Sequence, residues 1–156
     1  MRLTIAAIGR IKAGGERSLL DDYLARGTAA GRPLGLGPVS ETEIDNRALN
    51  SKAAESAALA NSLPDGARLC LMDERGKTLS SRDLAGTLGR WRDDGARETI
   101  FVIGGADGLD HAAFPAPDLV LSFGPMVWPH KLARVMLAEQ IYRSVSILAG
   151  SPYHRD

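Results

Sequence analysis

The sequence that decides the fold lies in the C-terminal third and reads TIFVIGGADGL (99–109), DLVLSFGPMVWPHKLARVMLAEQIYRS (118–144) and PYHR (152–155). Its apolar run 99–103 predicts a buried strand that ends at Gly104 and Gly105, where backbone must pass close to something else. A second strand-like run, 119–122, is followed by a short loop that contains Pro125. These two strand ends are the first candidates for a binding site.

The longest predicted helix, 130–148, begins directly after Pro129, and proline suits the first turn of a helix because its missing N–H costs nothing there. The helix carries two apolar stripes at helical spacing, whereas an ordinary surface helix needs only one. The first comprises Ala133, Leu137, Ile141 and Leu148, and the second comprises Leu132, Val135, Met136 and Tyr142. Two explanations remain open: the helix lies between its own sheet and a second subunit, or it is the central helix of a monomer.

Outward from this region, apolar runs alternate with helical patterns along the whole chain. Strands are predicted near 3–8, 34–39, 67–72, 99–103 and 119–122, and helices over 16–30, 48–63, 81–92 and 130–148. This alternation predicts an α/β fold with a mainly parallel sheet of about five or six strands flanked by helices. The polar segment 41–47 is expected to be mobile, and 73–77 to form a charged turn. Because no repeat or linker interrupts the chain, residues 1–156 are interpreted as one domain.

Composition narrows the class of protein. The chain has 156 residues, of which 44% are hydrophobic and 24% charged, as in an ordinary soluble globular domain. Its 19 basic and 19 acidic residues cancel, so nucleic-acid binding would need a local basic patch. The single cysteine, Cys70, excludes an internal disulfide and is consistent with the cytosol. Neither a signal peptide nor a membrane-spanning run is visible, so we expect a cytoplasmic protein with no membrane partner.

Three strand ends carry loops suited to a ligand, since open α/β sheets bind ligands beyond the carboxyl ends of their strands. These loops are 72–74, the glycine pair with the residues after it, and 123–128. The competing interpretation of the glycine cluster is a tight strand-to-helix turn, because G-G-x-x-G is not the dinucleotide fingerprint. A nucleophile elbow and a phosphate-binding loop are both missing. The histidines lack metal-ligand spacing, so no metal site is predicted.

The C-terminal tail is rich in functional side chains. Tyr153 offers a stacking face and a hydroxyl, His154 exchanges protons near neutral pH, and Arg155 suits a phosphate or a base edge. The alternative is an ordinary solvated tail.

The motifs IGGADGL (103–109), WPHKLARVMLAEQIYR (128–143) and PYHR (152–155), together with LTIAAIGRIK and MDERGK, resemble the SPOUT methyltransferases over nearly the whole chain. The closest resemblance is to the small single-domain members that methylate N3 of a pseudouridine in bacterial 23S rRNA. It implies a C-terminal deep trefoil knot, a homodimer, and S-adenosylmethionine as methyl donor. The neutral charge slightly favours a substrate recognised by shape, such as the assembled ribosome. A tRNA methyltransferase of this fold and a non-catalytic RNA- or nucleotide-binding dimer remain alternatives.

The resemblance also implies site residues. The donor-binding positions are Met72, Gly104, Gly105, Phe123, Gly124, Pro125, Met126, Val127 and Trp128. The loop 123–128 departs from the usual family pattern at several positions, which is tolerable if it binds mainly through backbone groups.

The expected chemistry needs no metal, because a methyl sulfonium is already activated. The base nitrogen N3 must lose a proton, so the enzyme needs a base or donors that stabilise the deprotonated ring. His154 and Arg155 are the candidates, with Tyr153 stacking or positioning. Positive charge for rRNA phosphates is expected from Arg10, Lys12, Arg134 and Arg143. Their alternative role is surface solvation or, for Arg143, an ion pair with Glu139.

Overall fold

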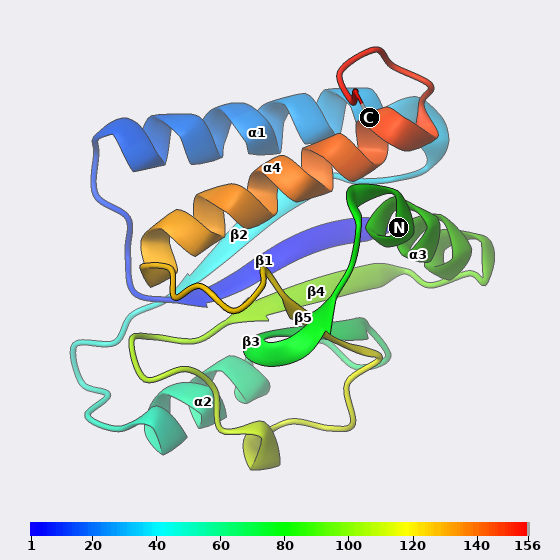
Figure 1. Cartoon of the computed structure of the whole chain (residues 1–156). Helices are drawn as coiled ribbons and strands as arrows, with labels where there is room; N and C mark the ends of the chain where they lie inside the picture. The colour runs from blue at the N-terminus through cyan, green and yellow to red at the C-terminus, as the bar shows by residue number, and fades with distance from the viewer. Residues whose placement is uncertain (156) are drawn as a thin grey trace.

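The computed structural model describes residues 1–155 and shows a five-stranded sheet (Figure 1). All strand pairs are parallel, and the strand order is β2-β1-β4-β3-β5. The strands are β1 (Arg2–Ile8), β2 (Val39–Ile44), β3 (Arg68–Thr78), β4 (Glu98–Ile103) and β5 (Leu119–Ser122). The predicted α/β class and parallel sheet are therefore confirmed. Because every strand runs the same way, all five carboxyl ends meet at one edge of the sheet.

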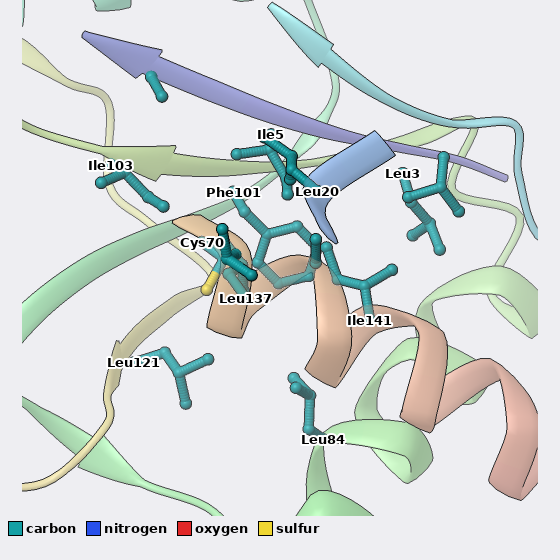
Figure 2. Packing of buried hydrophobic residues seen from close by; sticks show 14 of the residues in the cluster. Leu3, Ile5, Leu20, Cys70, Leu84, Phe101, Ile103, Leu121, Leu137 and Ile141 are labelled. Atoms are coloured by element: carbon teal, nitrogen blue, oxygen red, sulfur yellow. The ribbon is translucent and has the colours of Figure 1, made fainter. Parts of the chain in front are cut away.

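Helices cover both faces of the sheet (Figure 1). On one face lie α1 (Gly15–Gly31), α3 (Ser81–Asp93) and α4 (His130–Leu148), and on the other lie α2 (Lys52–Asn61) and the short helix η2 (His111–Ala113). The central strand β4 is buried on both sides. Phe101 and Ile103 join the core under α1, α3 and α4, as Figure 2 shows, whereas Ile100 and Val102 join the core under α2.

Helix α4 has the bounds that its sequence predicts. It packs between α1 and α3, so both apolar stripes find partners inside this chain. Leu137 and Ile141 are fully buried, whereas Leu132 at the N-terminal end remains exposed. The two stripes are therefore explained largely by the central position of the helix. Within residues 1–155, no helix is long and apolar enough to cross a membrane.

The second strand differs from the prediction. Residues 34–39 were expected to form it, but residues 32–34 form a 3₁₀ turn and the strand is Val39–Ile44. Gly35 and Gly37 adopt positive φ angles of 67° and 106°, which break an extended strand. The segment 41–47 looked polar and mobile because it contains Glu41 and Glu43. Both glutamates instead pair with arginines of α1 and α4, which makes this segment compatible with the sheet.

The third strand is longer than predicted. The segment 73–77, expected to be a charged turn, belongs to β3, which continues to Thr78. Met72 and Lys77 both pair with Leu121 of β5, so the residues between them bulge out of the ladder. At Gly76 a Cβ atom would lie 2.7 Å from the Val120 carbonyl oxygen, so only glycine fits where this bulge crosses β5.

Candidate functional site

A cavity of about 320 Å³ opens at the carboxyl ends of β3, β4 and β5. Its walls come from residues 72–75, 103–109 and 121–128, the three strand-end loops that the sequence singled out. The structure brings together the following predicted donor-binding residues: Met72, Gly104, Gly105, Phe123, Gly124, Met126, Val127 and Trp128. Pro125 lies in the same loop but is not among the lining residues. Sequence reasoning missed Lys52 and His130, which also line the cavity.

The glycine loop forms one wall with bare backbone. A Cβ atom on Gly104 would lie 2.5 Å from the carbonyl oxygen of Gly108, and one on Gly105 would collide with the carboxylate of Glu55. The amide of Gly108 donates to the carbonyl of Gly105 at 3.1 Å, which closes a tight turn. Both the turn and an exposed backbone surface are therefore present, so the two interpretations of this cluster are compatible.

Asp73 organises the wall formed by residues 72–75. Its side chain is 8% exposed, its Oδ1 accepts the backbone N–H of Arg75 at 2.8 Å, and its Oδ2 lies 2.8 Å from His111 Nε2. Burial alone would raise the pKa of the Asp73 carboxyl, but hydrogen bonds from Arg75 and His111 outweigh burial and lower that pKa to about 2. The cavity therefore keeps a fixed negative charge at this wall near neutral pH.

His130 stands where α4 begins and lines the cavity. Burial lowers the pKa of its imidazole, and the nearby cations Arg134 and Lys131 lower it further. The ring is therefore neutral near pH 7, which leaves one nitrogen able to accept a hydrogen bond.

Arg134 occupies a position that contradicts its expected role in binding rRNA phosphates. Its side chain is 0% exposed, and its guanidinium bonds Glu41 at 2.8 Å, Glu43 at 3.1 Å and the Ile8 carbonyl at 2.7 Å. All of these partners belong to the chain itself. Arg134 is therefore a structural residue that joins α4 to the ends of β1 and β2.

The other predicted cations lie in two places. Arg10 and Lys12 are exposed in the loop between β1 and α1, at the same edge of the sheet as the cavity. Arg143 forms an ion pair with Glu139 at 2.5 Å, the alternative that its i,i+4 spacing suggested. Its position toward the far end of α4 separates it from the cavity.

The tail folds back on α4 instead of extending into solvent. The Tyr153 ring lies 4.5 Å from the Tyr142 ring, and its hydroxyl donates to Glu139 at 2.9 Å. Burial and the Glu139 carboxylate both raise the pKa of this phenol. Nη1 of Arg143 lies 3.3 Å from Nδ1 of His154. The structure therefore places Tyr153 and His154 together, away from the cavity of the same chain. Arg155 is exposed, and Asp156 lies outside the described residues.

The protein is an α/β protein with a parallel sheet and a glycine-walled cavity at the carboxyl edge, the place where open α/β sheets commonly bind small molecules. Within residues 1–155, no group of three or more His, Cys, Asp and Glu side chains is arranged to hold a metal ion. The chain belongs to the SPOUT methyltransferases, because residues 1–154 match the family described as "Predicted SPOUT methyltransferase". That membership implies the C-terminal knot that the sequence resemblance predicted.

Curated relatives agree over the full length. A protein of Maricaulis maris is 66% identical over 156 residues, covering 100% of both chains, and one of Dinoroseobacter shibae is 54% identical over 155 residues, covering 99% of both. A protein of Paracoccus denitrificans is 53% identical over 156 residues, again with 100% coverage of both chains. All three carry the name "Ribosomal RNA large subunit methyltransferase H".

Proposed function

We propose that this chain transfers a methyl group from S-adenosylmethionine to N3 of a pseudouridine in 23S rRNA of the assembled ribosome. The observation that carries the proposal is the bare glycine wall of a cavity at the carboxyl edge of the sheet. The names of the full-length relatives support a large-subunit rRNA substrate. Such a substrate would place the protein in the cytoplasm.

The residues present fit this donor. A cavity of about 320 Å³ is large enough for a ligand of this size, since small-molecule pockets span about 300–1,000 Å³. Apolar walls from Met72 and Phe123 suit the adenine and the methionine chain. Gly104 and Gly105 contribute backbone to the cavity lining, which is packed too tightly to accept a Cβ atom at either position. When bound, the donor supplies an activated methyl group, and these residues bind and orient it.

The acceptor must lose a proton during the reaction. The bound donor would supply the methyl group to N3 and would leave as the neutral thioether, while the N3 proton would pass to a base of the protein. We assign the proton acceptor to His154 and the stabilisation of the deprotonated ring to Arg155, with Tyr153 placing the base. We assign rRNA phosphate contacts to Arg10 and Lys12, because both are exposed at the same edge of the sheet as the cavity.

The proposal requires two copies of the chain. Tyr142, against which the tail packs, lies twelve residues beyond His130 on α4, or about 18 Å at 1.5 Å per residue. A tail held there does not reach the cavity of its own chain, so a partner subunit has to bring its tail to it. The large apolar residues left exposed suit such a contact: Leu19, Met126, Val127, Trp128 and Leu132. Light scattering at micromolar protein should give the mass of a homodimer, and a monomer mass would contradict this arrangement.

The deciding experiment is methylation of purified ribosomes from cells that lack the gene. The protein is incubated with labelled donor, and the modified nucleotide is located by mass mapping of 23S rRNA. One methyl group on N3 of a pseudouridine supports the proposal. Methyl transfer to tRNA alone would favour the tRNA methyltransferase, and donor binding without transfer to any RNA would favour the non-catalytic dimer.

A further inference from the structure

The loop that forms the glycine wall is fastened at its downstream end. It leaves β4 at Gly104, and its residues 106–108 are exposed. The amide of Asp110 donates to Oγ of Ser56 at 2.8 Å, and Ser56 is fully buried in α2. One residue later, His111 Nε2 lies 2.8 Å from Asp73 Oδ2. The loop is therefore tied to α2 and also to the end of β3.

The second of these ties joins a residue that lines the cavity to the segment that follows the glycine loop. Asp73 lines the cavity from the bulge of β3, whereas His111 follows the wall formed by the loop after β4 and does not line the cavity itself. Within residues 1–155, this is the one side-chain hydrogen bond between segments 72–75 and 104–113. Breaking it would leave the two walls connected only through the sheet and through α2.

We propose that His111 is a positioning residue that fixes the glycine wall at the spacing at which the donor binds. The inference rests on the proposed function, since it takes the cavity to be the donor site. Asp73 is prepared for this contact, because its Oδ1 is engaged by the amide of Arg75 at 2.8 Å and its Oδ2 is presented to His111. The carboxylate accepts, so His111 Nε2 carries the hydrogen.

The bond between His111 and Asp73 acts by limiting the conformations of the glycine loop. Without the bond, the exposed residues 106–108 sample more conformations, and the binding-competent one is a smaller fraction of them. The donor must then order the wall as it binds, which weakens its affinity. Once the donor is bound, the wall is in place and the chemical step is unchanged.

The test is calorimetric titration of S-adenosylmethionine into the wild type and three variants. His111→Ala should weaken donor binding about fivefold, the size expected for a partly exposed charged hydrogen bond. His111→Gln keeps an N–H donor at similar reach and should restore the affinity to within about twofold of the wild type. Arg47→Ala removes an exposed ion pair to Asp45, neither of which lines the cavity, and should bind as the wild type does.

Kinetics and a double-mutant cycle separate positioning from general loss of structure. With ribosomes as acceptor, His111→Ala should raise the donor KM by the same factor and leave kcat at saturating donor unchanged. Adding Asp73→Asn to His111→Ala should cost less than the sum of the two single changes. Additive effects, a His111→Gln variant as weak as His111→Ala, or unchanged binding by His111→Ala would each overturn the inference alone. A wild type that does not bind the donor would overturn the proposed function as well.

Discussion

The two halves of the carboxyl edge of the sheet are built in opposite ways. At the β1 and β2 end, the side chain of Arg134 fills the space and bonds two glutamates and the carbonyls of Ile8 and Gly9. At the β3, β4 and β5 end, the corresponding space is open and walled by glycine backbone. The same parallel sheet therefore offers two potential ligand sites. The site at the β3, β4 and β5 end is open and is called the open half, and the site at the β1 and β2 end is filled by the protein itself and is called the closed half.

The difference shows how a buried charge can close one end of the carboxyl edge while the other end stays open. Burying a guanidinium is costly unless every nearby acceptor contributes, and Arg134 recruits two carboxylates and two carbonyls. Those interactions stabilise the closed half. The open half has no buried side chain that fills it as Arg134 fills the closed half, so its backbone groups stay accessible.

Replacing Arg134 should have the largest effect on stability. Arg134→Met should lower the free energy of unfolding by about 3–5 kcal/mol, because it leaves the 7%-exposed Glu41 and the nearby Glu43 short of a partner. Urea denaturation measures the change. Arg143→Met is the matched control, since its ion pair with Glu139 is partly exposed and should cost at most about 1 kcal/mol. Equal losses in the two variants would mean that the closed half is not held by Arg134.

Deleting the tail tests whether the open half suffices for donor binding. Removal of residues 153–156 should lower the rate of single-turnover methylation by about 10²-fold or more, because the groups proposed to face the deprotonated base are lost. Both halves of the edge stay intact, so calorimetry should give an unchanged donor affinity. The packing of Tyr153 on Tyr142 predicts a modest loss of stability as well. Near-normal turnover at saturating donor would show that the tail has no catalytic role.

The glycine wall can be filled one residue at a time. Gly104→Ala should weaken donor binding by more than about tenfold, because its Cβ meets the backbone of Gly108, which cannot move without opening the turn. Gly105→Ala should have a smaller effect, since the atom it meets is the end of the flexible Glu55 side chain. Gly105→Val should block binding, because its larger branched side chain occupies the wall. Equal affinities for the wild type and Gly105→Val would remove this wall from the donor site.

The smallest effect expected is a pH dependence at the open half. The pKa of Asp73 is about 2 in the folded chain and 3.8 in the absence of partners, so its stabilising contribution is present above about pH 4. It is lost as the pH falls toward 2. The stability difference between the wild type and Asp73→Asn should be about 1 kcal/mol at pH 7, because Arg75 is exposed, and should shrink by pH 2.5. A difference that does not change with pH would contradict the paired carboxylate.

Local sequence was enough to predict most of the open half, although the extension of β3 through residues 73–78 was missed. Strands that stop at glycines and a long helix that begins after a proline are determined by neighbouring residues, so β4, β5 and α4 were placed well. The position of the cavity could be predicted as well, because the carboxyl ends of parallel strands meet at one edge of the sheet. The tie between His111 and Asp73 was missed, since the two residues are far apart in sequence and neither belongs to a recognisable motif.

The structure of the closed half could not be predicted from neighbouring residues in the sequence. Glu41 and Glu43 make the β2 segment look like a polar loop, and only the arrival of Arg134 from α4 makes those charges compatible with a strand. For the same reason Arg134 was assigned to rRNA phosphates when its partners are internal. Arg134 lies about ninety residues from Glu41 and Glu43, and a sequence does not reveal that charged residues so far apart are paired and buried.

The position of β1 between β2 and β4 has a consequence for folding during synthesis. Arg2 pairs with Glu98 in β4, so one edge of the first strand waits for residues synthesised 96 positions later. At elongation rates of about 5–20 residues per second, that wait lasts on the order of 5–20 s. During this interval the nascent chain carries the apolar strand β1 with unpaired backbone groups along one edge. Such an edge can be bound by chaperones or can pair with another chain and aggregate. Sheet completion is therefore a late event that follows emergence of β4, and slow folding is expected from such long-range parallel pairing.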